Sequence, residues 1–219
     1  MWDWETQPEL DLVRLNKKRT TMLYIVKYSG PFGFIKPWTA VRDSETYSQQ
    51  FLTPSIIAGI ERKLFPELLN AGFGIYKIKR HRLTYQQVSQ QQEQIQPRGW
   101  NTKGTARNRT YERPRAILMR GIMVNPVLYL AFDNCEDAEQ ASKQHICLAR
   151  NEDILYPNEE ILEVTEEEFN TNDELFYGFE LILEKNEKSF LVGYNRMDEN
   201  RPMYGWLKIV GNPVKNEFK

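Results

Sequence analysis

Residues 83–114 read LTYQQVSQQQEQIQPRGWNTKGTARNRTYERP and interrupt a sequence that otherwise looks compact and foldable. The first half of this stretch is rich in glutamine and poor in core-forming residues, whereas the second half interleaves arginine and lysine with Trp100 and Tyr111. Cationic side chains bind phosphates, and exposed aromatic rings stack on single-stranded bases. The stretch therefore predicts a hairpin that lies along an RNA strand, and a merely solvated loop is the alternative interpretation.

Positive charge is concentrated around this insertion. Residues 76–120 contain eleven lysines and arginines against two acidic residues, although the 219-residue chain has a formal net charge of only −1. The compensating acidic residues fall mainly in 133–187, which includes three consecutive glutamates at 166–168. This polarity predicts one anion-binding face and a second face that repels nucleic acid or meets a basic protein.

The sequence on either side of the insertion predicts an α+β fold. Runs of β-branched and aromatic residues indicate strands, and Thr53 followed by Pro54 is typical of a helix start. The expected elements are a strand at 21–28, a helix from Pro54, a strand at 73–82, strand segments within 115–132 that break at Asn125 and Pro126, a helix at 133–145 and a strand at 146–155. The order βαββαβ is the ferredoxin-like arrangement, which RNA-recognition domains use among many others.

We expect three parts in the chain. Residues 1–20 form a leader, and 21–165 form a ferredoxin-like palm. The insertion at about 83–114 would be a β-hairpin thumb between the second and third strands of that palm. Residues 166–219 would form a carboxy-terminal antiparallel β appendage, because strand-like runs there alternate with charged turns.

Metal and cofactor chemistry is disfavoured by the residue types available. The only histidines are His81 and His145, and no cysteine and histidine group has zinc spacing, so we predict no metal site. Glutamates within 159–168 leave a carboxylate magnesium site open, with a solvated acidic face as the simpler interpretation. No phosphate-binding loop, dinucleotide fingerprint or nucleophile elbow occurs, so no cofactor is predicted.

Membrane insertion and export are also disfavoured. The longest apolar run, 116–132, is interrupted by Arg120 and is shorter than the roughly 20 residues that span a bilayer. The amino terminus carries Asp3 and Glu5 where a signal peptide needs basic residues. We therefore predict a cytoplasmic protein without a membrane partner.

A catalytic alternative rests on His81. Lys79, Arg80 and Arg82 surround it in the sequence and could hold a phosphate while a neutral imidazole takes a proton from a ribose 2′-hydroxyl. Tyr47 could serve as a second general base. The competing interpretation places His81 as a polar side chain on an exposed strand face.

Four stretches, in this order, carry a resemblance to a known family. They are YSGPFGFIKP at 28–37, Tyr47 with FLTPSIIAGI at 51–60, RPRAIL with NPVLYL at 113–118 and 125–130, and CLARNED at 147–153. Together they resemble the CRISPR-associated protein 5 family, the Cascade backbone subunit that caps the 5′ end of the guide RNA in type I systems. The resemblance covers most of residues 22–164 and does not extend to the carboxy-terminal region.

The resemblance implies a palm and a thumb that grip the 5′ handle of the guide RNA (crRNA) and touch the neighbouring backbone subunit. In one subtype a family member also cleaves precursor RNA with a tyrosine and a Lys-His pair. Tyr47 matches the tyrosine, but residues 115–120 hold no Lys-His pair. We therefore expect a non-catalytic subunit, in antiviral defence or in a transposon-associated complex, that contacts target DNA only indirectly.

The expected RNA contacts come from both parts. They are Lys36, Trp38, Arg42, Tyr47, Lys77, Lys79, Arg80, Arg82 and Arg150 on the palm, and Arg98, Trp100, Lys103, Arg107, Arg109, Arg113 and Arg115 on the thumb. The acidic half would meet protein, with the large Cascade subunit as the expected neighbour. Two alternatives stay open, namely a metal-free endoribonuclease that uses His81 and Tyr47, and an RNA-binding module unrelated to CRISPR.

Overall fold

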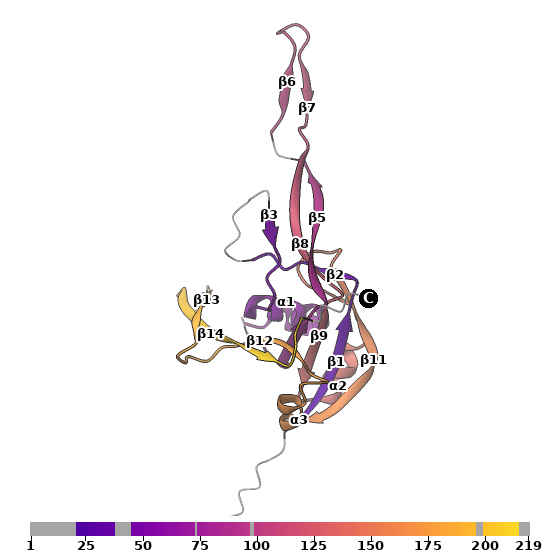
Figure 1. Ribbon diagram of the computed structural model, residues 1–219, viewed down its shortest axis with the longest axis vertical. Coiled ribbons are helices and arrows are strands. Elements are labelled where there is room, and N and C mark those ends of the chain that lie inside the picture. The colour runs from indigo at the N-terminus through magenta and orange to yellow at the C-terminus, as the bar shows by residue number, and fades with distance from the viewer. Residues whose placement is uncertain (1–20, 38–44, 73, 97–98, 196–198, 215–219) are drawn as a thin grey trace, which may run out of the picture.

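The computed structural model describes residues 21–37, 45–72, 74–96, 99–195 and 199–214. It has a mixed α+β body of mostly antiparallel strands, from which one long hairpin projects (Figure 1). Within the described ranges no helix is long and apolar enough to cross a membrane. The α+β class expected from the sequence is confirmed.

An eight-stranded sheet forms the centre of the body. Its order is β10-β11-β1-β9-β4-β12-β14-β13, and every neighbouring pair is antiparallel. The bounds are β1 Met22–Ser29, β4 Ile78–Thr84, β9 Val127–Phe132, β10 Ile146–Cys147, β11 Ile154–Thr165, β12 Gly178–Ile182, β13 Phe190–Asn195 and β14 Arg201–Val210. The sheet therefore joins segments that are far apart in the sequence.

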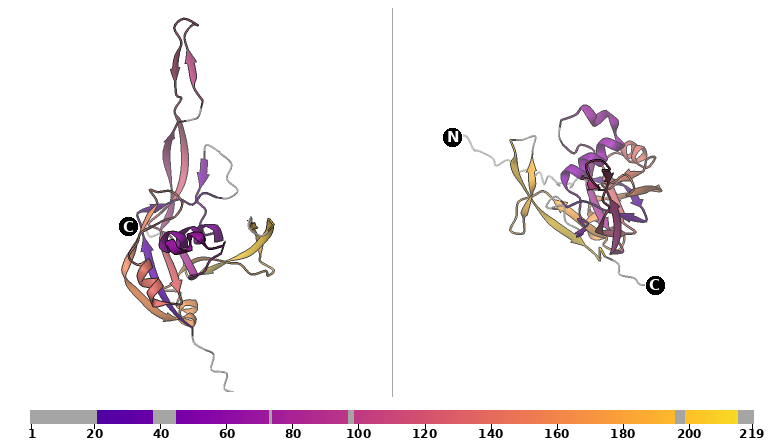
Figure 2. Two further views of the ribbon diagram at one scale, coloured as in Figure 1. Left: turned by 180° about the vertical axis from the view of Figure 1, so that it is seen from behind. Right: turned by 90° about the horizontal axis from the view of Figure 1, so that it is seen from above.

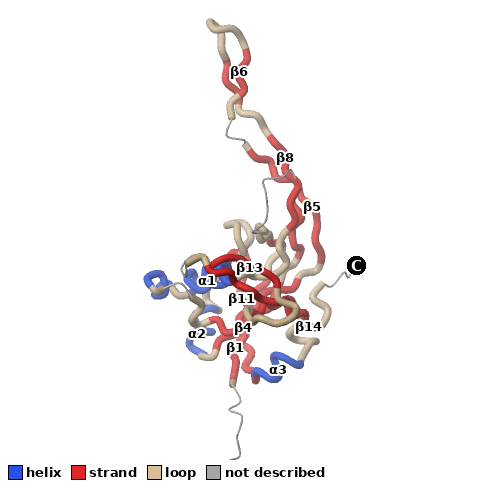
Figure 3. The backbone as a smooth tube through the Cα atoms, turned by 90° about the vertical axis from the view of Figure 1, so that its left-hand side faces the viewer, coloured by secondary structure: helices blue, strands red, loops and turns tan. Residues whose placement is uncertain are grey.

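Helices cover both faces of this sheet. The helices are α1 Pro54–Leu64, the short 3-10 helix η1 Pro66–Asn70, α2 Cys135–Ala141 and α3 Glu166–Thr171. Figure 3 shows α1 and α2 on one side of the strands and α3 on the other. Strand β1 serves both layers because its side chains alternate: Val26 and Tyr28 join the core beneath α1 and α2, whereas Leu23 and Ile25 join the core beside α3.

Local sequence signals explain where the helices begin. Extended Thr53 precedes Pro54 at the first turn of α1, as predicted. The side chain of Asn134 accepts a hydrogen bond from the Glu136 N–H at the start of α2. Glutamates 166–168 form the first turn of α3, where the helix dipole stabilises carboxylates.

The projecting hairpin consists of two stacked ladders. The lower ladder pairs β5 Gln87–Ile95 with β8 Ala116–Val124 over nine positions, and the upper one pairs β6 Asn101–Lys103 with β7 Thr110–Glu112. Two short strands, β2 Phe32–Gly33 and β3 Glu45–Tyr47, flank β8 at the base. The hairpin projects along the long axis of the molecule, whereas β13 and β14 extend to the side (Figure 2).

The predicted break at Asn125 and Pro126 is confirmed, because it separates β8 in the hairpin from β9 in the large sheet. Asn125 has φ +48°, a left-handed conformation that asparagine adopts more readily than most residues. The chain can therefore change sheets within two residues.

Three expectations about strands differ from the structure. The strand expected at 73–82 is β4, which spans Ile78–Thr84. The strand predicted at 146–155 is wrong, since β10 ends at Cys147 and the long strand is β11, which runs through the acidic segment. The exposed glutamates of β11 include the neighbours Glu159 and Glu160, which lie where the register with β1 shifts between Val26 and Tyr28. The carboxy-terminal strands are antiparallel as predicted, but β12 joins β4 through Phe179 opposite Leu83, so they continue the large sheet.

Candidate nucleic-acid interface

One face near the end of the hairpin combines aromatic and cationic groups. Trp100 and Tyr111 are 55% and 62% exposed. The guanidinium of Arg113 lies 4.7 Å from the centroid of the Trp100 ring, within cation–π range. Thr102 pairs with Tyr111, and because strand side chains alternate, Trp100 two residues earlier lies on the same face. Exposed rings with a neighbouring cation suit single-stranded nucleic acid.

The cations at the tip are not equivalent. Lys103 forms an ion pair with Glu112, with 2.8 Å between Nζ and Oε2. This hydrogen bond lowers the pKa of Glu112, to which Arg115 adds a smaller electrostatic effect. Arg107 and Arg109 lie in the exposed turn between β6 and β7 and form no ion pair within the described part of the chain. They are therefore available to bind phosphate.

Gly104 allows the tight turn at this tip. Its φ is +100°, and a Cβ there would lie 1.9 Å from the carbonyl oxygen of Asn108. Only glycine fits both the backbone conformation and the close approach. This turn brings the two exposed arginines to the far end of the hairpin.

A second group of cations lies at the base of the hairpin around Phe34. The guanidiniums of Arg120 and Arg150 lie 5.7 and 5.2 Å from the centroid of this buried ring. Arg120 pairs with Glu93 at 3.0 Å, and Arg150 pairs with Asp153 at 2.7 Å. Both arginines keep some exposure while carboxylates fix their position. Lys36 is exposed two residues beyond Phe34.

Tyr47 also lies at the base of the hairpin. It is opposite Gly121 on β8, where a Cβ would lie 2.2 Å from the Tyr47 ring. Its hydroxyl donates to Glu45 Oε1 at 2.9 Å and accepts from Gln90 Nε2 at 2.6 Å. Tyr47 therefore ties β3 to both strands of the lower ladder while its ring stays half exposed.

The cations of β4 and the residues before it contact the protein's own acidic groups. Arg80 makes a bidentate ion pair with Glu180, and Glu180 Oε1 lies 2.5 Å from Arg80 Nε. Arg82 is 0% exposed, packs against Phe169 at 4.1 Å and donates to the carbonyl oxygen of Phe176. Burial of its whole side chain leaves Arg82 no surface to offer RNA.

Lys77 and Lys79 are held in the same way. Lys77 pairs with Asp137 at 2.8 Å and with Glu67 at 2.9 Å, and Lys79 pairs with Asp133 at 3.1 Å. The acidic groups come from η1, from α2 and from the residue that precedes the α2 cap. The body of the protein therefore neutralises most of the charge that the sequence places next to the insertion.

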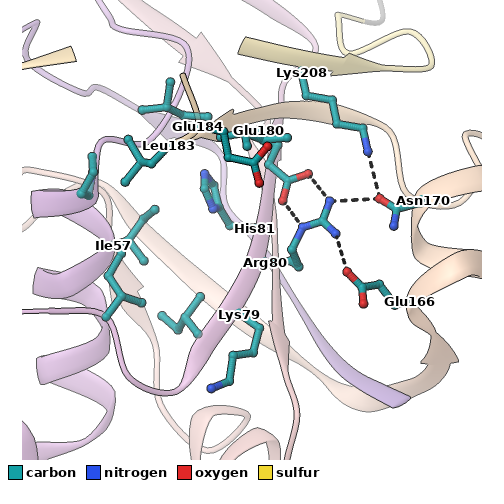
Figure 4. A pocket seen from close by; sticks show the side chains of 15 residues that line it. Ile57, Lys79, Arg80, His81, Glu166, Asn170, Glu180, Leu183, Glu184 and Lys208 are labelled. Carbon is teal, nitrogen blue, oxygen red and sulfur yellow. Dashed lines mark hydrogen bonds and ion pairs between the residues drawn. The ribbon is translucent and has the colours of Figure 1, made fainter. Parts of the chain in front are cut away.

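The environment of His81 suits a structural side chain. It is 6% exposed, and burial lowers its pKa to about 4, so the imidazole is neutral near pH 7. Its Nε2 has no hydrogen-bond partner among the described residues. Figure 4 places the ring beside Leu183, on the wall of a pocket. Tyr47 lies in a different sheet, so the structure does not favour a catalytic pair with His81.

Three expected contact residues, Trp38, Arg42 and Arg98, lie outside the described residues. Sequence reasoning missed Phe34 and Arg120 as parts of the base. The role of Arg120 follows only from the strand register, which sets Arg120 opposite Gln91 and on the same face as Glu93. Among the described residues no group of three or more histidines, cysteines or carboxylates gathers into a metal-binding cluster.

Among the comparisons with known proteins, only the comparison with solved structures gives a match. No protein-family model matches this chain, and no curated protein matches it. A solved chain described as "CRISPR RNA-guided surveillance complex" matches with a TM-score of 0.51 and 12% sequence identity. The alignment covers 88% of this chain and 90% of that chain. At this identity the match shows that the two chains share a fold over nearly their whole lengths.

Proposed function

We propose that this protein is a non-catalytic guide-RNA-binding subunit of a type I CRISPR effector complex, similar to the CRISPR-associated protein 5 family. In this proposal the β5–β8 ladder and its β6–β7 tip form the thumb, and the body forms the palm. The protein would grip the 5′ handle of the crRNA and contact the neighbouring backbone and large subunits in the cytoplasm. It would meet target DNA only through the guide.

The single observation that carries the proposal is the exposed end of the hairpin. Trp100, Tyr111 and Arg113 share one face there, and Arg107 and Arg109 are free of carboxylates within the described residues. Rings for base stacking and cations for phosphate are the two elements that a single-stranded RNA site needs.

The topology of the body supports a ferredoxin-like palm. The strands β1, β4, β9 and β11 follow one another in sequence with α1 after the first and α2 after the third. In the sheet they lie in the order β11-β1-β9-β4, all antiparallel. The hairpin leaves between β4 and β9, the second and third strands, where the sequence resemblance places the thumb. The fold match to a chain of a CRISPR surveillance complex, over 88% of this chain, points the same way.

The proposed contact set is narrower than the sequence suggested. We assign the thumb contacts to Trp100, Arg107, Arg109, Arg113 and Arg115. At the base we assign Lys36 and Tyr47, which lie at the foot of the hairpin. Arg82 is left out because it is buried. The other cations left out are those that carboxylates already hold, namely Lys77, Lys79, Arg80, Lys103, Arg120 and Arg150.

Fluorescence anisotropy on a labelled crRNA with its 5′ handle tests the proposal. Binding should weaken with added salt, because phosphate contacts release counterions. Replacing Arg107→Ala together with Arg109→Ala should reduce the slope of log affinity against log salt by about one unit per lost contact. The matched control is Lys185→Ala with Lys188→Ala, which removes the same charge from an exposed turn between β12 and β13.

Two outcomes would overturn the proposal. If the double arginine variant keeps the affinity and salt slope of the wild type, the hairpin is not the thumb. If an RNA of equal length without the handle binds equally well, the protein is a general RNA-binding module. Discrete cleavage of repeat RNA in EDTA, lost in a folded His81→Ala variant, would instead establish an endoribonuclease.

A further inference from the structure

The pocket beside His81 lies on the body and takes no part in the proposed thumb. Its volume is about 520 Å³, within the range of small-ligand sites. Its walls come from α1, β4, α3 and β12, with Lys208 from β14 (Figure 4). His81 contributes a buried imidazole whose Nε2 has no partner among the described residues.

This pocket is a split in the large sheet. The strands β4 and β12 pair at one position, Phe179 opposite Leu83. An antiparallel ladder continued from there would set His81 opposite Leu181 and Lys79 opposite Leu183. These four residues line the pocket instead. Across the described residues of both strands no further ladder pair joins them, so two unpaired strand edges face each other.

The two open sides of the split differ in chemistry. On the α1 side Pro54 and Ile57 give an apolar wall, whereas on the α3 side the wall is formed by Glu166, Asn170 and Lys208. Glu166 is paired with Arg80 at 3.2 Å, but Lys208 donates only to Asn170 Oδ1, at 2.9 Å, and forms no ion pair within the described chain. Glu180 and Glu184 also line the pocket, and Glu180 is paired with Arg80. Glu166 and Glu180 act on Lys208 through space without an ion pair, so its ammonium group can still accept the contact of an acidic side chain.

We propose that this split accepts an extended segment of a partner protein, which adds a short strand between β4 and β12. Unpaired strand edges bind extended polypeptide through main-chain hydrogen bonds, and alternate side chains then enter different pockets. The segment carries apolar side chains toward α1 and an acidic side chain toward Lys208. The two sides are lined by residues 78–81 of β4, which include the register shift at Lys79, and by residues 181–184, which are the end of β12 and the two residues after it. The split therefore accommodates about four residues at strand spacing.

An isolated peptide of matched chemistry tests this site without knowledge of the partner. The probe is an acetylated and amidated hexapeptide of alternating valine and glutamate, added to the full-length protein and followed by amide chemical shifts. We expect shifts confined to residues 78–81 and 181–184 and to the His81 imidazole. Lys208→Ala should weaken binding by about tenfold, because it removes a hydrogen bond between charged groups. Lys185→Ala, on the exposed turn after β12, is the matched control and should bind as the wild type does.

Two further probes test whether the peptide binds through its backbone and whether it binds at this pocket. The same peptide with every second backbone nitrogen methylated should fail to bind. Methylation removes the N–H groups with which the peptide would donate hydrogen bonds to one of the two strands. Leu183→Asp, at an exposed position on the rim, should abolish binding without unfolding the protein. Absence of binding, equal binding of the methylated peptide, or shifts in these residues caused by nucleoside monophosphates and not by the peptide would overturn the proposal. Guide-RNA binding by the hairpin would be unaffected by any of these outcomes.

Discussion

Strand β4 with its preceding residues and the tip of the hairpin carry similar runs of lysine and arginine, yet their surroundings are opposite. Glu180 and Glu166 come from the carboxy-terminal half and pair with Arg80. At the tip, Arg107 and Arg109 face solvent. The acidic excess that suggested a second binding face is therefore partly used inside the protein. Charge density in the sequence predicts available cations only where no acidic segment folds back onto them.

The largest expected effect follows from removing the charge of Glu180. This carboxylate is 2% exposed, and Arg80 and Arg82 depend on it. Because an uncompensated buried charge is costly, Glu180→Gln should lower the free energy of unfolding by about 3 to 5 kcal/mol. Urea denaturation measures this loss. Glu184→Gln, on the exposed end of the same segment, is the control and should change stability little. A Glu180→Gln protein as stable as the wild type would show that the arginines of β4 do not need this partner.

A pH series further tests the buried surroundings of β4, through His81. Burial lowers the pKa of His81 to about 4 in the folded protein, whereas an unfolded histidine titrates near pH 6.5. Between these values the unfolded chain binds a proton that the folded protein does not. The free energy of unfolding should therefore fall as the pH drops from about 6.5 toward 4, by up to about 3 kcal/mol.

Denaturation at pH 7 and pH 5 checks this dependence. His81→Phe should flatten it, whereas His145→Phe, at an exposed position, should leave it unchanged. An equal slope in wild type and His81→Phe would contradict the assignment of the effect to His81.

The variant Trp100→Ala tests the exposed tip of the hairpin. Stacking of one base on an aromatic ring contributes about 1 to 3 kcal/mol, so crRNA affinity should drop by about tenfold or more. Tyr194→Ala removes a similarly exposed ring from β13, far along the sequence from the hairpin, and should leave affinity unchanged. Equal losses in both variants would mean that the tip has no special role in binding.

The smallest expected effect is that of Lys79→Ala. This lysine is partly exposed and pairs with Asp133 at 3.1 Å, and exposed ion pairs contribute little to stability. Both the stability and the crRNA affinity should stay close to those of the wild type in denaturation and anisotropy measurements. A loss of affinity as large as that of the tip arginines would bring β4 back into the RNA interface.

Much of the fold could be predicted because its signals are local. Thr53 and Pro54 mark the start of α1, Asn125 and Pro126 mark the change of sheet, and glutamine and arginine without apolar periodicity mark the hairpin. Strand β11 could not be found in this way. Its glutamates resemble a solvated acidic face, and only pairing with β1, for example Ile25 opposite Leu162, makes it a strand.

The alternation of strands and helices, the insertion and its aromatic and cationic tip can be inferred from the sequence, because they depend on residues that are neighbours along the chain. Which cations are free follows only from the tertiary structure. Glu180 is about one hundred residues from Arg80, and Arg82 becomes buried only when α3 and Phe176 pack on β4. Electrostatic pairing acts over a few ångströms of space, and the distance between two residues in space is set by the fold.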